Sequence, residues 1–286
     1  MEDRIETIGR GSVIQHGKLN DRIYLIKLGK GDFPGILDSL TTMARENCYS
    51  KLFCKIPDWA APLFFADGYI TEAIIPGFYQ GIESAFFVAK YLDSNRLMNL
   101  EKESFMELSG LFGSTINQES LPKNGAIKVR QLDLSDVEQI ADIYRKVFLS
   151  YPFPIQNPGY ILETMKENVS YFGVKQKGRL IAVASAEIDF EGRNAEMTDF
   201  ATISDYRGHK LGQRLLTKME KEMKAIGILT LYTIARLQSI PMNKVFLKHQ
   251  YQYAGTLVRN TNISGSIESM NVYYKQIYYA NRTKFG

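Results

Sequence analysis

The strongest constraint on the fold is a strand, a loop and a long helix that follow one another between residues 195 and 226. Ala195–Ile203 has the composition of a strand, and the loop Asp205–Gly212 separates it from an amphipathic helix that ends at Gly227. A strand that leads into a helix in this way predicts an α/β domain. The buried stripe of the helix is expected at Leu211, Leu215, Met219, Met223 and Ile226.

Periodicity over residues 127–278 predicts the order β-α-α-β-β-β-α-β-α-β-β, a mixed α/β domain. The polar, turn-rich segment 113–125 predicts a domain boundary, which divides the chain into residues 1–122 and 123–286. Within the first part, strands at 51–56, 70–75 and 85–92 and a helix at 58–66 repeat the order of the C-terminal end of the second. We therefore hypothesise that the N-terminal domain is a degenerate half-copy of the C-terminal domain. Chance recurrence of short β-α-β-β units is the alternative.

Composition excludes several classes of protein. Of the 286 residues, 45 % are apolar and 23 % charged, which is globular usage, and the net charge of +4 does not by itself indicate nucleic-acid binding. Cys48, Cys54 and three histidines form no metal-ligand spacing, so we expect no metal. The first ten residues lack the apolar core of a signal peptide, and no run approaches the ~20 apolar residues of a membrane span. We expect a soluble, reduced, cytoplasmic protein with neither nucleic acid nor membrane as a partner.

The loop Arg207–Gly212 suits a ligand that carries phosphate groups. The first four N–H groups of a helix have no partner within the helix, and the helix dipole favours negative charge there. Gly208 and Gly212 allow close approach of the backbone, Lys210 adds a positive charge, and His209 and Leu211 complete the loop. A plain strand-to-helix turn is the alternative. The order strand, loop, helix favours pyrophosphate binding.

From Ile127 onward the chain resembles the GNAT superfamily of acetyltransferases, whose pyrophosphate loop reads Q/R-x-x-G-x-G/A. Arg207 and Gly212 match this pattern, whereas Lys210 stands where the family usually has its first glycine. The resemblance implies a GNAT fold and acetyl-CoA as the cosubstrate. It also implies that the pantetheine arm pairs with the backbone of strand 199–203, which contains Phe200, Ala201 and Thr202.

Several further strings are similar to the family of β-lysine N6-acetyltransferases, and this resemblance spans nearly the whole chain. They are YPFPI (151–155), ASAEID (184–189), AEMTDFAT (195–202), MNKVF (242–246) and, near the N-terminus, IPGFYQG (75–81). The resemblance implies acetylation of the terminal amine of β-lysine, which gives N6-acetyl-β-lysine, a compatible solute. Glu72, Tyr79 and Tyr91 are predicted acceptor contacts on this resemblance alone. The alternatives are another small amine or a protein lysine as acceptor, or a module that binds CoA without turnover.

Glu196 is the first candidate for a general base. An aliphatic amine with a pKa near ~10.4 arrives as ammonium, so a base must remove its proton. Glu196 lies eleven residues before Arg207, the spacing at which some GNAT enzymes place a catalytic glutamate. Alternation along a strand puts Glu196 and Thr198 on the face opposite to Asp199, so only one of the two acids is expected to face the acetyl group. Asp199 is the second candidate, and an ion pair with a surface lysine is its alternative role.

Five other side chains complete the predicted site. Tyr151 and Phe153 are expected to wall the aliphatic chain of the acceptor, although plain packing is the preferred interpretation for Phe153. Ser239 and Asn243, four residues apart on a helix, are expected to hydrogen-bond the cofactor arm, unless Asn243 is a solvated helix residue. Phe246 stands where many GNAT enzymes have a tyrosine that protonates the leaving thiolate, so we expect a weaker donor or water instead.

Overall fold

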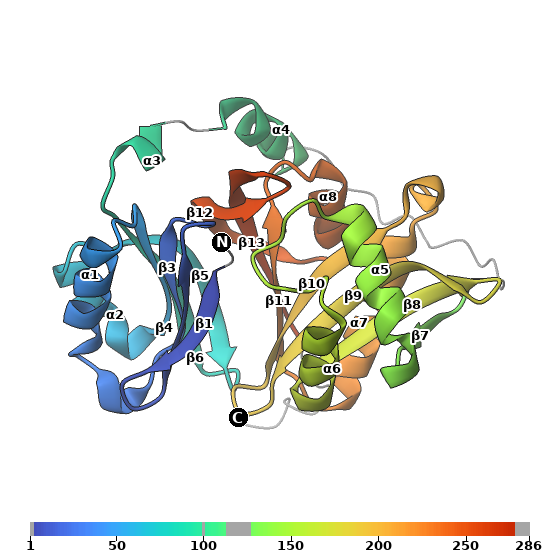
Figure 1. Ribbon diagram of the computed structural model, residues 1–286, viewed down its shortest axis with the longest axis horizontal. Helices are drawn as coiled ribbons and strands as arrows, with labels where there is room; N and C mark the ends of the chain where they lie inside the picture. Colours follow the sequence, from blue (N-terminus) through green and yellow to red (C-terminus); the bar gives the residue numbers. More distant parts are fainter. Residues whose placement is uncertain (1–2, 99–100, 113–126, 278–286) are drawn as a thin grey trace, which may run out of the picture.

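The computed structural model describes residues 3–98, 101–112 and 127–277 (Figure 1). It confirms the mixed α/β class, with a single thirteen-stranded sheet across the described residues. We call residues 3–112 the N-terminal half and residues 127–277 the C-terminal half. The boundary predicted at residues 113–125 lies outside the described residues, so the division into residues 1–122 and 123–286 stays a prediction.

The C-terminal half confirms the predicted order β-α-α-β-β-β-α-β-α-β-β. The first strand is short, and the helix that follows the predicted phosphate loop is the longest. The elements are β7 (Val129–Gln131), α5 (Val137–Val147), α6 (Pro158–Glu167), β8 (Val169–Gln176), β9 (Arg179–Asp189), β10 (Asn194–Thr202), α7 (Leu211–Ala225), β11 (Thr230–Arg236), α8 (Ile240–Lys248), β12 (Gln252–Ile263) and β13 (Ser266–Gln276).

The N-terminal half contains three more strands than the sequence predicted, all before residue 28. Its elements are β1 (Arg4–Ile8), β2 (Ser12–Gly17), β3 (Arg22–Lys27), α1 (Ile36–Glu46), β4 (Lys51–Pro57), α2 (Ala61–Ala66), β5 (Ile70–Tyr79), β6 (Glu83–Tyr91), α3 (Asn95–Met98) and α4 (Lys102–Phe112).

Helices cover the sheet on different faces in the two halves. In the C-terminal half, α5 and α6 pack on one face through Ile140, Tyr144 and Ile161, and α7 packs on the other through Leu215 and its neighbours. In the N-terminal half, α1 and α2 lie together on the outer face (Figure 1). The inner face of that half, which carries Tyr24, Phe53 and Phe87, packs against apolar side chains of β11, β12 and β13. This inner packing brings β3 and β4 next to the C-terminal half.

The two halves share the sheet at the antiparallel pair β5–β12, where Ala73 lies opposite Gly255. A Cβ atom at Gly255 would lie 2.0 Å from the carbonyl oxygen of Glu72, and Gly255 has a φ of +150°. Only glycine permits this approach. Beside it the ammonium of Lys51 lies 2.9 Å from the Glu72 carboxylate and donates to the carbonyl of Val258 at 2.8 Å, so a buried ion pair also joins the halves.

Both halves follow the same strand order. β1-β2-β3-β4-β6-β5 corresponds to β8-β9-β10-β11-β13-β12, and the parallel pair β3–β4 corresponds to the parallel pair β10–β11. The match includes β1–β3, so it extends beyond the half-copy that the sequence suggested. Descent of the N-terminal half from a copy of the C-terminal half stays a proposal, and this strand order supports it.

Two absences concern the described ranges alone. None of the helices there is long and apolar enough to cross a bilayer. No group of three or more histidine, cysteine, aspartate or glutamate side chains in the same ranges is placed to hold a metal ion.

Candidate active site

The parallel strands β10 and β11 separate soon after they begin. Their register ends at the pair Glu196–Tyr232, whereas β10 stays paired with β9 on its other side as far as Thr202. The backbone groups of β10 that point toward β11 beyond Glu196 therefore pair with no strand of the described sheet. Buried amides and carbonyls need partners, so this edge is available to an extended ligand with amide groups.

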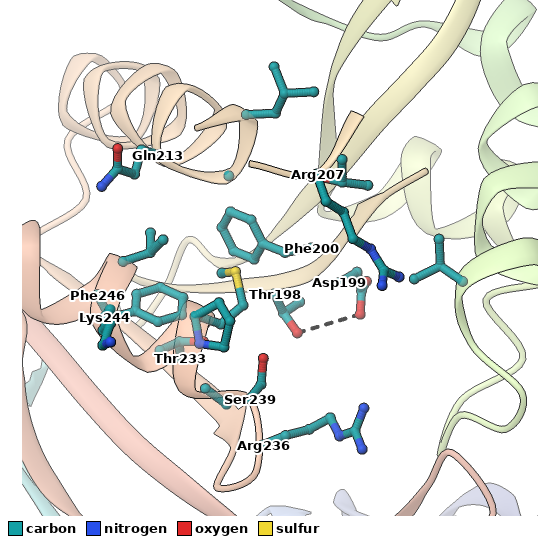
Figure 2. Close-up of a pocket in the computed structure, with 18 of the residues that line it drawn as sticks. Thr198, Asp199, Phe200, Arg207, Gln213, Thr233, Arg236, Ser239, Lys244 and Phe246 are labelled. Atoms are coloured by element: carbon teal, nitrogen blue, oxygen red, sulfur yellow. Dashed lines mark hydrogen bonds between the residues drawn. The ribbon is translucent and has the colours of Figure 1, made fainter. Parts of the chain in front are cut away.

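A larger cavity, of about 740 Å³, opens where the two strands separate. Figure 2 shows Arg207, Arg236, Ser239 and Lys244 around it. Five basic side chains and one acidic one line it, which suits a polyanionic ligand. The predicted cofactor contacts that line it are Phe200, Thr202, Arg207, Gly208, Lys210, Leu211, Gly212 and Ser239.

The loop before α7 has the backbone of an anion site. Gly208 has a φ of +82°, and Lys210, the N-cap of α7, has a φ of +56°. Lys210 thus adopts the left-handed conformation that glycine favours. The backbone of the loop therefore follows the same path as with the usual glycine, although the lysine Cβ adds a strain of about 1 kcal/mol. The Lys210 ammonium carries only donors, so it cannot cap the amides of the first helical turn, and no side-chain capping bond is present there.

Gly212, in the first turn of α7, borders open space. A Cβ atom there would meet only the Met242 sulfur, at 3.6 Å, which is an ordinary contact. The packing of the protein therefore does not require glycine at this position. The space beside the helix terminus is large enough for a ligand to approach the backbone closely.

Three predicted cofactor contacts do not line the larger cavity, and the predicted contact through the backbone of Ala201 stays a prediction. Ala201 is buried in the core beneath α5. His209 turns back on its own loop, where its Nδ1 atom lies 3.2 Å from the carbonyl oxygens of Tyr206 and Arg207. Asn243 is the third.

Asn243 has a structural position. It is fully buried, which excludes the solvated alternative as well. Its amide nitrogen donates to the carbonyls of Arg236 and Ser239, and its oxygen accepts from Asn271 Nδ2 and the Tyr273 hydroxyl, each at 2.8 Å. These bonds use the whole carboxamide to tie α8 to β11 and β13.

A smaller cavity, of about 210 Å³, lies between the two halves. Strands β3, β4, β10 and β11 each line it with alternate residues, as expected where one face of a strand borders a cavity. It meets the larger cavity at Tyr151, Thr198, Asp199, Ile234, Ile263 and Met270, which line both. The strand residues that line the smaller cavity include Arg22, Tyr24 and Ile26 on β3, Phe53 and Lys55 on β4, Glu187 on β9, Glu196 and Thr198 on β10, and Tyr232 and Ile234 on β11.

Glu196 and Glu187 face each other across the β9–β10 ladder in the smaller cavity. Burial raises the pKa of the Glu196 carboxyl to about 7, opposed by the Lys55 ammonium and a hydrogen bond from the Tyr232 hydroxyl. Burial and the charge of Glu196 raise the pKa of Glu187 to about 8. A carboxyl whose pKa lies near 7 can accept a proton at neutral pH and still hold it strongly enough to be useful.

Asp199 occupies a bulge, which corrects the expectation that it faces away from Glu196. The β9–β10 register shifts between Thr198 and Ala201, and Asp199 has a φ of +55°. The alternation therefore fails after Thr198, and both acids line the smaller cavity. The Asp199 carboxylate accepts hydrogen bonds from Tyr151, from Ser185 at 2.5 Å and from Thr198 at 3.4 Å, while burial raises its pKa. No surface lysine forms an ion pair with it in the described residues.

Tyr151 and Phe153 both pack against the core beneath α5 and α6, the role preferred for Phe153, and their contact with an acceptor stays a prediction. Both line the smaller cavity, and Tyr151 also lines the larger one. The side-chain amide of Gln15 on β2 donates to the carbonyl of Pro152, so the N-terminal half holds this loop in place.

The three acceptor contacts predicted from resemblance alone do not line either cavity. Glu72 belongs to the ion pair with Lys51 and also accepts from the backbone N–H of Val258 at 2.9 Å and from the Tyr91 hydroxyl. Tyr79, at the end of β5, packs edge-on against Phe78. Glu72, Tyr79 and Tyr91 therefore serve packing and the junction between the halves, not the cavities.

Comparison with known proteins identifies the family. The model of the acetyltransferase (GNAT) family matches residues 137–249. The chain is 38 % identical over 266 residues to a β-lysine N6-acetyltransferase of Methanococcus maripaludis, an alignment that covers 92 % of this chain and 96 % of the relative. The chain belongs to the GNAT family of acetyltransferases. It is an acetyl-CoA-dependent N-acetyltransferase.

Two further GNAT relatives also match over nearly their whole length. The N-acetyltransferase YodP of Bacillus subtilis is 31 % identical, with 96 % of this chain and 98 % of the relative covered. A β-lysine N6-acetyltransferase of Methanosarcina mazei is 29 % identical, with 86 % and 98 % covered. Because these alignments include most of the chain, the relatives share the N-terminal half as well as the GNAT domain.

The charged or polar side chains of this GNAT site that sequence reasoning missed include Arg22, Tyr24, Lys55 and Glu187. Glu187 had a signal, because a hairpin centred near Gly192 places it opposite Glu196. The other three come from the N-terminal half, and no local pattern shows that β3 and β4 reach the site.

Proposed function

We propose that this enzyme transfers the acetyl group of acetyl-CoA to the N6 amine of β-lysine and so forms N6-acetyl-β-lysine. Two of the relatives bear the name of this activity. The observation that carries the proposal is the presence of both acidic and basic side chains around the smaller cavity. Its lining contains three acids (Glu187, Glu196, Asp199) and two bases (Arg22, Lys55). A diamino acid has one carboxylate and two ammonium groups, so the bases offer partners for its carboxylate and the acids offer partners for its ammonium groups.

The size of the smaller cavity supports a small acceptor. Both halves wall it, and about 210 Å³ suits one amino acid whose aliphatic chain contacts Tyr151 and Phe153. A protein lysine would need an open groove for the peptide on each side of it. We therefore favour a free diamino acid over a protein acceptor.

In this proposal acetyl-CoA binds the larger cavity, with its pyrophosphate at the loop Arg207–Gly212 and its pantetheine arm along β10. The basic lining, the left-handed backbone at Gly208 and Lys210, and the open space beside Gly212 fit such a ligand. When bound, it supplies the thioester carbon that the amine attacks, and the CoA thiolate leaves.

Glu196 is the proposed base. Its carboxylate takes the proton of the N6 ammonium, and the resulting free amine is the nucleophile. Asp199 is less available, because hydroxyl groups of Tyr151, Ser185 and Thr198 already donate to it. Asp199 instead orients Tyr151 and Thr198 where the two cavities meet. Since Phe246 offers no proton donor, these hydroxyls or water are the proposed proton source for the thiolate.

The test is an acceptor comparison with acetyl-CoA at neutral pH. We expect β-lysine to give the highest kcat/KM among β-lysine, α-lysine, spermidine and a lysine-containing peptide, with mass spectrometry locating the acetyl group on N6. A higher kcat/KM for α-lysine or for the peptide would refute the acceptor and leave the acetyltransferase activity intact. We further propose that the product acts as a compatible solute in the cytoplasm, and its accumulation under salt stress is the measurement.

A further inference from the structure

Arg22 is a buried cation of the N-terminal half. Its side chain lies on β3, is 3 % exposed and borders the smaller cavity. Within the described residues no carboxylate forms an ion pair with it. Burying a guanidinium without a counter-charge is costly, so a ligand that supplies one would be strongly favoured there.

The hydrogen bonds of Arg22 leave part of its fork unused. Nη1 donates to the carbonyl of Asn260 and to the Thr261 hydroxyl at 3.2 Å, and Nη2 reaches the Gln15 side chain only at 3.4 Å. Nε is buried and has no partner among the described atoms. Burial and the nearby Arg96 lower the pKa of Arg22 to about 9, so it is still charged at neutral pH.

The other cation of the smaller cavity is already matched. Lys55 feels the charges of Glu196, Asp189 and Glu187, and its Nζ lies 3.5 Å from the Tyr232 hydroxyl. The acids therefore gather at the wall formed by β9 and β10 together with Lys55. Arg22 lies in the other half, on β3, where the charges of Asp3 and Glu72 favour its ionised form although neither carboxylate forms an ion pair with it.

We propose that Arg22 binds the carboxylate of the acceptor, so that the N-terminal half selects amino acids over simple amines. This inference rests on the proposed function. An acceptor whose carboxylate meets Arg22 directs its opposite end toward Glu196. The planar fork of arginine suits a carboxylate, and Arg22 thereby sets which end of a diamine is acetylated.

The experiment compares β-lysine with β-lysine amide, which keeps both amines and loses the carboxylate. In the wild-type enzyme we expect kcat/KM to be about 10- to 100-fold higher for the acid, the value of a charge-assisted hydrogen-bonded contact. Arg22→Gln should lose most of this preference, through a higher KM for the acid and little change for the amide. Arg22→Lys should keep part of it.

Arg96→Gln is the matched control. Arg96 is also buried, donates to the carbonyls of Asn20 and Arg259 at 2.9 and 2.8 Å, and lines neither cavity. This variant should lose stability yet keep the preference for the acid.

Equal kcat/KM for acid and amide in the wild-type enzyme would overturn the inference, whether or not Arg22→Gln folds. So would an equal loss on both acceptors in Arg22→Gln. If β-lysine is not acetylated while another amino acid is, the proposed acceptor fails, and the same comparison with that amino acid and its amide decides the role of Arg22.

Discussion

Replacing Lys55 with methionine should shift the pH at which the enzyme becomes active. Glu196 must be ionised to act as a base, so kcat rises with pH through the pKa of that carboxyl. Burial raises this pKa to about 7, and the charge of Lys55 opposes the increase most strongly. Without Lys55 the pKa of Glu196 should increase further, and the rise in kcat should move to higher pH.

The magnitude follows from the effect of one opposite charge. A cation close to a carboxyl lowers its pKa by roughly 1–3 units, so the smallest expected shift in Lys55→Met is from about 7 to about 8. At pH 7 the ionised fraction of Glu196 then falls from about one half to about one tenth. The variant should lose about fivefold in kcat at pH 7 and recover near pH 9.

The assay is the release of CoA thiol at saturating substrates between pH 5.5 and 9.5. Lys55→Arg keeps the charge and should keep the wild-type midpoint. A midpoint that does not move in Lys55→Met, or a loss that is equal at every pH, would refute this role for Lys55 in setting the pKa of Glu196.

Other expected outcomes concern the base, the phosphate loop and the junction. Glu196→Gln should lower kcat by about 10²- to 10⁴-fold with little change in the KM for acetyl-CoA, and the loss should shrink at high pH; wild-type kcat at pH 7 would pass the role to Asp199 or water. Gly212→Asp should weaken acetyl-CoA binding at least ~10-fold by calorimetry, whereas Gly212→Ala adds only a contact with Met242; equal affinities would remove the loop from the site. Glu72→Gln should lower the free energy of unfolding, measured in urea, by about 3–5 kcal/mol, because it leaves Lys51 buried without its partner. The double variant with Lys51→Met should recover part of this loss. No loss in Glu72→Gln would mean that the pair is not buried in solution.

Local patterns predicted the C-terminal half well because its elements are specified by nearby residues. The stripe from Leu211 to Met223 is buried and glycines mark the turns, so the order of eleven elements is correct. The prediction is wrong for Ile226, which is the C-cap of α7 and is exposed, because the helix ends before it completes another buried turn. The loop Arg207–Gly212 was found for the same reason, since its function depends on backbone freedom and on the helix that follows it directly.

The bulge at Asp199 shows where such reasoning fails. The period of two predicts opposite faces for Glu196 and Asp199, but one residue with a φ of +55° turns Asp199 into the cavity. Aspartate tolerates this conformation better than most side chains, yet many strand aspartates do not adopt it. A bulge depends on the pairing partner, here β9, and the residues of one strand do not show it.

The contribution of the N-terminal half could not be read from local sequence at all. Arg22 and Lys55 reach the acceptor cavity because β5 joins β12 at a single pair, Ala73–Gly255, between residues far apart in the chain. In the sequence Gly255 does not differ from any other glycine. Its close approach to Glu72 is evident only once the neighbouring strand is known. Glu72 and Tyr79 were misassigned for the complementary reason, because resemblance alone does not distinguish a junction residue from a cavity residue.

The N-terminal half keeps the strand order of a GNAT domain but not its cofactor site. The segment after β3 corresponds to the phosphate loop, and the Asp32 carboxylate accepts hydrogen bonds there from Arg10 N–H and from the N–H and hydroxyl of Ser12. These bonds, led by that of the Ser12 hydroxyl, lower the pKa of Asp32 and tie the segment after β3 to the turn between β1 and β2.

The parallel pair β3–β4 keeps four residue pairs, from Arg22–Lys51 through Leu25–Cys54, whereas β10–β11 keeps three. Helices comparable to α5 and α6 do not cover the inner face of the described N-terminal half, and Arg22 and Lys55 on that face point into the smaller cavity instead. The N-terminal half, with the same strand order, thus supplies one wall of the smaller cavity. We infer that this half was retained because that wall carries the charges that an amino-acid acceptor requires.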